Sequence, residues 1–241
     1  MFQFYIPELK FDQQQVFITS EEFHHLKNVR RVKTGEVVRV FNGKGLVFKV
    51  KIKKFYKDKV ETEVVEKYVV EKKSYKLILC QGIIEVNKFE EVIEKTTEVG
   101  IDEIIPLKLE HCVINVDKFI KKYQRFNKLI IESVKQTNRI FLPVLHNIHR
   151  LENVFKEDDS INIVCYKNSE TNLYNIFDII REAEKIKIFV GPEGDFSQKE
   201  IEVLKHQKNV VFVKLNDAIL RSETAAIVAV STISQIKLLT N

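Results

Sequence analysis

Two strand–loop–helix units follow one another near the end of the chain, and they constrain the fold more than any other feature. In the first unit an apolar strand at residues 186–190 leads into the loop 191–195, and Ser197 begins a helix. In the second unit a strand at residues 210–215 leads into the polar loop 216–224, and an alanine-rich helix follows. Because α/β sheets bind ligands beyond the carboxyl ends of their strands, the two loops predict one ligand crevice.

The same alternation of strands and helices extends back to residue 75. Strands are predicted at residues 76–80, 101–107 and 161–165, and helices at residues 88–99, 117–135 and 172–183. The helix 88–99 is amphipathic, with Phe89, Val92 and Ile93 on one face, and Gly100 stands where a C-terminal cap belongs. This alternation predicts a largely parallel sheet with helices on both faces.

Up to about residue 71 the pattern is mostly that of strands. Strands at residues 37–41 and 46–53 flank the turn sequence 42–45 and predict a hairpin, in which Val50 and Ile52 face one side and lysines the other. Further strands are expected at residues 2–6 and 60–65, with one helix at residues 21–33. So many short strands predict a small closed or nearly closed β-barrel. The charged segment 66–73 is the best boundary, which predicts domains at residues 1–71 and 72–241.

Composition sets wide limits on the class of protein. A chain of 241 residues with 44% hydrophobic and 30% charged residues is ordinary for a globular protein. No apolar run approaches the roughly 20 residues of a membrane-spanning helix, and the first residues lack the pattern of a secretory signal. Cys80, Cys112 and Cys165 are widely spaced, which predicts reduced thiols in a cytoplasmic protein and no metal site.

The chain is moderately basic, with a net charge of +5 and a pI near 8.9. This charge is compatible with a nucleic-acid partner. A biased base composition in the genome, which also makes Lys, Ile, Asn and Phe abundant, produces the same excess by itself. The position of the charges is therefore more informative than their sum.

The two loops also have purely structural explanations. Gly191 and Gly194 allow positive φ and close backbone approach, but most loops of this kind are only tight turns. The first loop lacks the spacing of dinucleotide and Walker motifs, so nucleotide phosphate binding is disfavoured. In the second loop, Ser222 or Thr224 is expected to cap the following helix. Glu223 complements the helix dipole there, and Arg221 pairs with a carboxylate.

Five segments together resemble the ribosomal RNA small-subunit methyltransferase E family, the uracil-N3 methyltransferases of 16S rRNA, which belong to the knotted SPOUT superfamily. The two cofactor-loop motifs are matched by Gly191-Pro192-Glu193-Gly194 and by Ile219-Leu220-Arg221-Ser222-Glu223-Thr224-Ala225. The central pattern is matched by Lys88, Lys95-Thr96-Thr97-Glu98-Val99-Gly100 and Pro106. The N-terminal RNA-facing segment is matched by His25-Leu26-x-x-Val29-x-Arg31. The cysteine- or glutamine-bearing Arg-x-x-x-Pro region is matched by Gln136-x-Asn138-Arg139…Pro143. The segments occur in the family's order and cover nearly the whole chain.

The resemblance implies an α/β fold: a SPOUT-type, mostly parallel sheet with a C-terminal trefoil knot, plus a small N-terminal PUA-like β-barrel that binds RNA. It also implies S-adenosylmethionine as cofactor, 16S rRNA within the small ribosomal subunit as substrate, and a homodimer. The chain departs from the family at Asn216 and Ala218, where the family has Gly and Arg, and at Asp195, where a second glycine is common. Asn216 is expected to keep the turn by adopting a left-handed conformation.

The resemblance also assigns candidate site residues. Arg221 cannot be the base, because arginine stays protonated. It is expected either to stabilise the negative charge that develops on uracil when N3 loses its proton or to hold an RNA phosphate. Glu223, Glu193 or water removes the proton. The expected cofactor-binding residues are Gly191, Pro192, Glu193, Gly194, Leu215, Ile219, Leu220, Arg221, Ser222, Thr224 and Ala225. The expected RNA-binding residues are His25, Arg30, Arg31, Lys33, Asn138 and Arg139.

The predicted function is methylation of uridine N3 in 16S rRNA. Two alternatives remain open. One is a ribosome-assembly, RNA-binding protein of the same fold without turnover, which the missing guanidinium at Ala218 motivates. The other is a methyltransferase that acts on transfer RNA.

Overall fold

The computed structural model describes residues 1–155 and 159–239. The chain divides into two compact units, and each is described by itself. The first comprises Met1–Lys72 together with Val134–Leu142, and the second comprises Lys73–Ser133 together with Pro143–Asn241.

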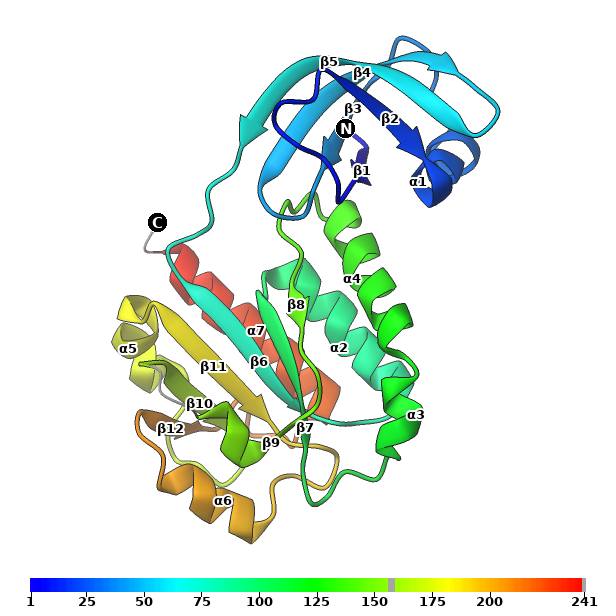
Figure 1. The fold of residues 1–241 in the computed structure, drawn as a ribbon. Coiled ribbons are helices and arrows are strands. Elements are labelled where there is room, and N and C mark those ends of the chain that lie inside the picture. The colour runs from blue at the N-terminus through cyan, green and yellow to red at the C-terminus, as the bar shows by residue number, and fades with distance from the viewer. Residues whose placement is uncertain (156–158, 240–241) are drawn as a thin grey trace. The chain divides into compact units, whose positions relative to one another are not determined.

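The first unit is built on one curled sheet (Figure 1). Its strands are β1 (Gln3–Tyr5), β2 (Gln15–Thr19), β3 (Val37–Phe41), β4 (Leu46–Phe55) and β5 (Lys59–Val69). They lie in the order β1-β3-β4-β5-β2, so the sheet resembles half a barrel, with β1 and β2 at its two ends. The β3–β4 hairpin is confirmed, as is its alternation, because Val50 and Ile52 are fully buried while Lys51 is exposed. The sequence did not predict β2.

The predicted helix at residues 21–33 is shorter in the structure. It consists of α1 (Ser20–His24) and a π-helical turn, η1 (His25–Val29). The N–H of Val32 donates to the carbonyl of Leu26, and Arg31 adopts a left-handed conformation with φ of 52°. A left-handed residue cannot continue a right-handed helix, so the prediction of a helix to residue 33 was wrong at its end.

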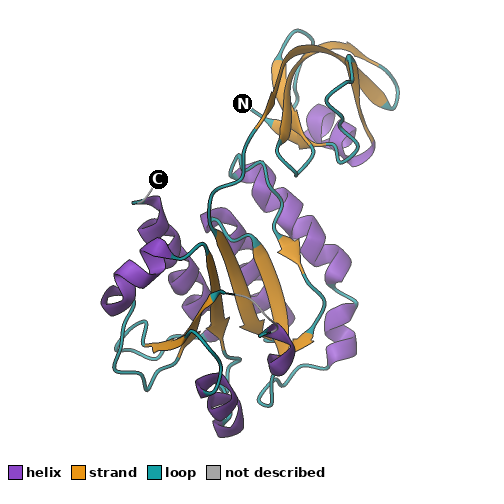
Figure 2. Cartoon of the chain, turned by 60° about the vertical axis from the view of Figure 1, so that its left-hand side comes forward, coloured by secondary structure: helices purple, strands orange, loops and turns teal. Residues whose placement is uncertain are grey.

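The second unit contains the parallel sheet that the alternating pattern predicted. Its strands are β6 (Lys76–Gly82), β7 (Glu103–Lys108), β8 (Val144–Leu145), β9 (His149–Arg150), β10 (Ile161–Cys165), β11 (Lys185–Val190) and β12 (Val210–Val213). Among the described residues they lie in the order β12-β10-β11-β6-β7-β8, with β9 also beside β7, and every pair is parallel. The carboxyl ends of β6, β10, β11 and β12 therefore meet at one edge of the sheet (Figure 2).

Helices cover both faces of this sheet, as predicted. The α-helices of the second unit are α2 (Val86–Val99), α3 (Val116–Ile120), α4 (Tyr123–Gln136), α5 (Phe177–Glu182), α6 (Gln198–Lys205) and α7 (Ser222–Leu238), with the 3-10 turns η2 (Leu151–Val154) and η3 (Tyr174–Ile176). Helix α7 packs on β6 and β11 and against α2 and α5. On the opposite face, Ile201 and Leu204 of α6 join the buried cluster of Ile78 and Cys80 from β6.

Local sequence signals for helix ends are confirmed, whereas two helix lengths were wrong. Ser197 and Glu200 form the capping box of α6, and Gly100 ends α2 with φ of 113°. The predicted helix 117–135 is divided between α3 and α4 at a tight turn, where the N–H of Lys122 donates to the carbonyl of Phe119. The predicted helix 172–183 begins later, because the Asn172 side chain accepts the N–H of Asn175 and holds a turn there.

Three fully buried phenylalanines hold α2, α3 and α4 together. The ring centroid of Phe119 lies 4.8 Å from that of Phe89 and 5.1 Å from that of Phe126. Aromatic pairs at such distances contribute beyond the area they bury. No helix among the described residues is long and apolar enough to span a bilayer.

We predict that Phe119→Ala lowers the free energy of unfolding by about 3–5 kcal/mol, because it leaves a cavity between these helices. Denaturant titration measures the change. The matched control is Ile120→Ala, since the Ile120 side chain is 51% exposed, and its effect should stay within about 0.5 kcal/mol. Equal losses in the two variants would contradict the role of the aromatic cluster.

Candidate functional site

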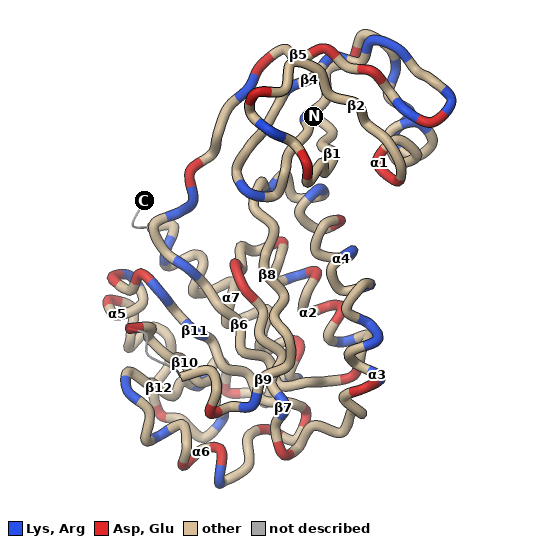
Figure 3. Tube along the Cα trace, viewed as in Figure 1, with Lys and Arg blue, Asp and Glu red and all other residues tan. Residues whose placement is uncertain are grey.

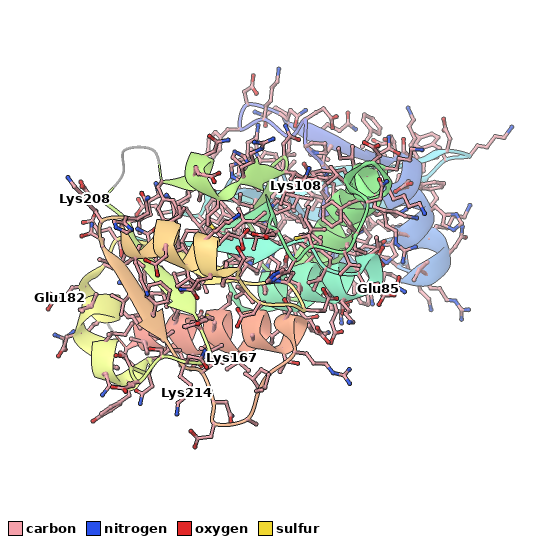
Figure 4. All side chains as sticks on the ribbon, turned by 90° about the horizontal axis from the view of Figure 1, so that it is seen from below. Glu85, Lys108, Lys167, Glu182, Lys208 and Lys214 are labelled. Atoms are coloured by element: carbon pink, nitrogen blue, oxygen red, sulfur yellow. The ribbon has the colours of Figure 1, made fainter. Side chains whose placement is uncertain are left out.

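A cavity of about 640 Å³ lies at the carboxyl edge of the parallel sheet in the second unit. It is lined by Lys88, Cys165, Tyr166, Lys167, Val190, Gly191, Pro192, Glu193, Gly194, Asp195, Lys214, Leu215, Asn216, Ala218, Ile219, Leu220, Arg221, Ser222, Glu223 and Ala225. These residues come mainly from the loops that follow β10, β11 and β12. Figure 4 shows Lys167 and Lys214 on two of these loops, beside α7. The structure therefore brings the two predicted loops together around one cavity.

Ten of the eleven predicted cofactor-binding residues line this cavity, and Thr224 does not. Thr224 is exposed in the first turn of α7. The capping expectation for Ser222 or Thr224 was wrong, because Arg221 is the N-cap residue and no side chain caps the helix. The Ser222 hydroxyl instead bonds to the other loop.

The first loop is tight enough to require its glycines. A Cβ on Gly194 would lie 2.8 Å from the Cβ of His111, and a Cβ on Gly191 would lie 3.1 Å from the Cα of Asp195. Asp195 itself has φ of 62°, and its carboxylate accepts the N–H of Phe196 at 2.8 Å. The left-handed backbone explains why glycine suits this position, and Asp is among the residues that tolerate it.

A buried chain of hydrogen bonds joins the two loops to the sheet. The Ser222 hydroxyl donates to the carbonyl of Gly191 at 2.6 Å and accepts from Gln81 Nε2 at 2.9 Å. Gln81 Nε2 also donates to the carbonyl of Gly82, and the Gln81 side chain is fully buried at the end of β6. Ser222 thus fixes the start of α7 against the end of β11.

Two further side chains hold the first loop from outside. His111 Nδ1 lies 2.9 Å from the carbonyl oxygen of Gly194 and 3.0 Å from that of Asp195. The hydrogen bonds to Asp195 and Gly194 raise the pKa of His111 above its usual value. Lys88 Nζ lies 3.3 Å from Glu193 Oε1, which links the loop to α2.

The cavity contains several charged groups. Glu223 is 7% exposed, and its Oε2 is buried with no hydrogen-bond partner among the described residues. Arg221 is exposed. Burial raises the pKa of Cys165 to about 12, so its thiol stays protonated near pH 7 and is not a nucleophile.

The turn in the second loop is held by a side-chain hydrogen bond and not by the left-handed residue that was expected. Asn216 does not have positive φ, so the expectation of a left-handed residue there was wrong. Its side-chain oxygen instead accepts the N–H of Ala218 at 3.0 Å, and Lys214 bonds to Asp217 at 2.8 Å. Ile219 is 80% exposed although it lines the cavity.

All six predicted RNA-binding residues lie in the first compact unit. This includes Asn138 and Arg139, which the sequence assigns to the second domain. Strand β1 connects the two segments, because Gln3 Nε2 donates to the carbonyl of Arg139 at 3.0 Å and the ring of Phe4 lies 5.9 Å from that of His25.

The side chains of these candidates differ in their surroundings. The Arg30 guanidinium lies 5.0 Å from the ring centroid of Phe2, while Arg31, Lys33 and Asn138 are exposed. Burial and the neighbouring Lys135 lower the pKa of His25, so its imidazole is neutral near pH 7. No group of three or more potential metal ligands occurs within residues 1–155 and 159–239.

Sequence reasoning missed several residues of the cavity. Tyr166 and Lys167 follow β10, a strand that was predicted correctly, so the rule that ligands bind beyond strand ends was sufficient to include them. No local pattern marks Gln81 or His111. Their roles depend on contacts 141 and 83 residues away along the chain.

Comparison with known proteins shows one consistent relationship. A family model described as an RNA methyltransferase domain matches residues 71–234, and one described as an RNA methyltransferase PUA domain matches residues 18–65. Ribosomal RNA small subunit methyltransferase E of Bacillus subtilis is 31% identical over 228 residues, covering 90% of this chain and 88% of that protein. Its counterpart in Rickettsia conorii is 30% identical over 223 residues, covering 90% and 86%.

Solved structures show the same relationship. A ribosomal RNA small subunit methyltransferase E from Neisseria gonorrhoeae, bound to S-adenosyl methionine, has a TM-score of 0.86 at 25% identity and covers 98% of this chain and 97% of its own. A methyltransferase from Legionella pneumophila, in complex with the same cofactor, has a TM-score of 0.86 at 26% identity and covers 97% of both chains.

We predict that Gln81→Met and Ser222→Ala are strongly coupled in a double-mutant cycle of unfolding free energies. Each substitution should cost about 1–3 kcal/mol, because it leaves buried polar groups unpaired. The double variant should lose less than the sum of the two, by at least about 0.5 kcal/mol. Ser160→Ala, at a fully buried serine before β10, is the control and should be additive with Gln81→Met. Additivity in both pairs would contradict the bridge.

Proposed function

The chain belongs to the ribosomal RNA small subunit methyltransferase E family of RNA methyltransferases, and on that premise we propose that it methylates N3 of a uridine in 16S rRNA, with S-adenosylmethionine as methyl donor. The proposed substrate is the rRNA within the small ribosomal subunit, and the proposed site of action is the cytoplasm. The observation that carries the proposal is the cavity, because both predicted cofactor loops and Glu223 line it.

The residues of the cavity fit this cofactor. A volume of about 640 Å³ lies within the usual range for small-molecule sites, roughly 300–1,000 Å³. Glu193, Asp195 and Glu223 line the cavity together with four basic residues, Lys88, Lys167, Lys214 and Arg221. A positively charged sulfur is therefore favoured only where it lies beside one of the three carboxylates. The buried, unpartnered Glu223 Oε2 is an acceptor without a donor in the described protein. We propose that the backbone of residues 190–194 and 215–220 holds the adenosine, and that the carboxylates offset the sulfonium charge.

The reaction needs a proton acceptor, because uracil N3 carries a proton at neutral pH. When bound, the cofactor supplies an electrophilic methyl group. Two carboxylates are candidates for the base. Glu193 is engaged by Lys88, whereas Glu223 Oε2 has no partner among the described residues, which favours Glu223. We propose that Glu223 accepts the proton from uracil N3, so that the electron pair of the broken N3–H bond stays on N3. A bound S-adenosylmethionine would supply the methyl group to that nitrogen, and the electron pair of its S–CH3 bond would remain on the departing neutral thioether.

Arg221 has a different proposed role. Its guanidinium stays protonated, so it can stabilise negative charge on the substrate but cannot accept the N3 proton. Because Arg221 is exposed where it lines the cavity, it is placed to stabilise the negative charge that develops on the uracil ring or to hold an adjacent phosphate. Lysine at this position could not offer a uracil oxygen or a phosphate the two parallel N–H donors of a planar guanidinium.

We predict that the purified protein forms N3-methyluridine in small subunits isolated from cells without this activity. Arg221→Ala should lower the rate by about 100-fold or more, as loss of a charge-stabilising donor does elsewhere. Mass analysis of nucleosides from digested rRNA measures the product. Arg150→Ala is the matched control, since Arg150 is exposed on β9 and does not line the cavity.

Other outcomes of this experiment separate the alternatives. Methylation of transfer RNA in place of small subunits would identify the second substrate class. Calorimetry with S-adenosylmethionine separates the assembly factor from the enzyme, because micromolar binding favours the enzyme and absence of binding favours the assembly factor. Near-normal turnover by Arg221→Ala would remove that residue from the mechanism.

We also propose that the chain forms a homodimer and that its C-terminal segment forms a trefoil knot. The family relationship supports both, and the exposed Ile219 on the second loop is an apolar side chain suited to a partner surface. A stable dimer should bury on the order of 2,000 Å² or more. Light scattering should give the mass of two chains, and the mass of one chain would contradict the dimer.

A further inference from the structure

Helices α3 and α4 and the turn between them carry five exposed basic side chains within eleven residues. This group, here called the lysine face, consists of Lys118, Lys121, Lys122, Arg125 and Lys128. The buried side of the same segment contains Phe119, Phe126 and Ile130. Figure 3 shows the blue of Lys and Arg recurring along this segment.

This segment holds the whole net charge of the chain. The full sequence has 39 basic and 34 acidic residues. Residues 118–128, which span the lysine face, contain five basic and no acidic residues, which leaves 34 of each in the rest of the chain. A general excess of lysine from base composition would be spread over the surface. The concentration in one segment indicates a local function.

The charges of the lysine face differ in how far they are neutralised. Arg125 forms a two-pronged ion pair with Glu90 of α2, with Nε–Oε1 at 2.5 Å and Nη2–Oε2 at 2.6 Å. Lys118, Lys121 and Lys122 have no carboxylate partner in the part of the chain that the structure describes. Three cations therefore remain available to an anionic partner.

The lysine face is connected to the cavity within the second unit. Seven residues before Lys118, His111 bonds to the carbonyls of Gly194 and Asp195 in the first cavity loop. Helix α2 provides a second connection, because its Lys88 pairs with Glu193 of that loop and its Glu90 pairs with Arg125. An RNA bound along α3 and α4 would thus be held by elements that also hold the cavity loop.

The chemistry of the lysine face favours a phosphodiester backbone over a single anion. Flexible exposed lysines form no enclosed pocket for one phosphate, whereas repeated charges match a partner with repeated charges. The N-terminus of α3 is not available, because the Asn115 side chain caps the N–H groups of Asp117 and Lys118. Contacts of this kind position a nucleic acid without reading its sequence.

We propose that the lysine face binds the phosphodiester backbone of the rRNA that flanks the methylated nucleotide. The proposal rests on the proposed function and adds the surface that holds the substrate while the cavity receives the base.

The test is a triple Lys→Gln variant at Lys118, Lys121 and Lys122. Its affinity for small ribosomal subunits isolated from cells without this activity is measured from about 0.05 to 0.3 M salt. We predict affinity about tenfold weaker than wild type at 0.1 M salt, and a log–log salt slope shallower by about 2, since each lost contact to single-stranded RNA removes about 0.7. A triple Lys→Arg variant keeps the charges and should bind like the wild type.

The matched control is a triple Lys→Gln variant at Lys199, Lys205 and Lys208, which are exposed on α6 and the turn after it. It removes the same charge and should change affinity by less than about twofold. S-adenosylmethionine affinity, measured by calorimetry, should be unchanged in both Lys→Gln variants.

Equal affinities and salt slopes for the two Lys→Gln variants would overturn the proposal that the lysine face binds RNA. Weak binding by the Lys→Arg variant would overturn it as well. A change of oligomeric state confined to the α3–α4 variant would also overturn it, because the face would then contact protein. If the wild type methylates normally while the α3–α4 variant matches the control, only the lysine face fails. If the wild type neither binds rRNA nor methylates it, the proposed function fails and the lysine face with it.

Discussion

The cavity depends on one buried hydroxyl group. Ser222 donates to the carbonyl of Gly191 and accepts from Gln81, so the end of β6, the loop after β11 and the start of α7 meet at a single oxygen. A parallel sheet brings strand ends to one edge, but it does not fix the distance between the loops that follow. Because an unpaired buried polar group costs about 1–3 kcal/mol, this bridge selects one arrangement of the two loops.

The features that the sequence predicted correctly are those set by residues close together in the chain. The capping box of Ser197 and Glu200 and the left-handed Gly100 depend on contacts within one helical turn. The parallel sheet also follows from local patterns, because each apolar strand is separated from the next by a helical segment. Ten of the predicted cofactor-binding residues line the cavity because they lie directly after strands β11 and β12.

The features that could not be predicted depend on distant partners. Nothing in the apolar strand around Gln81 marks this residue. Its role depends on Ser222, which lies 141 residues later in the chain and accepts its hydrogen bond. Arg221 and not Ser222 is the N-cap of α7, because the serine hydroxyl is engaged by Gly191, a contact that no helix-end rule includes. The net charge of +5 had the same limitation. The sequence gives the net charge directly. It does not show which basic side chains form one exposed face, because that depends on how α3 and α4 pack.

Glu223 shows how such a structure combines stability with function. A carboxylate oxygen that is buried without a partner destabilises the protein in which it lies. An apolar residue at the start of α7 would remove this cost and still pack against the sheet, but it would offer a ligand neither charge nor an acceptor. The cost is recovered only when a donor enters the cavity, so binding of the donor and stability of the loops are linked. The same oxygen that weakens the free protein is therefore an acceptor for a donor that enters the cavity.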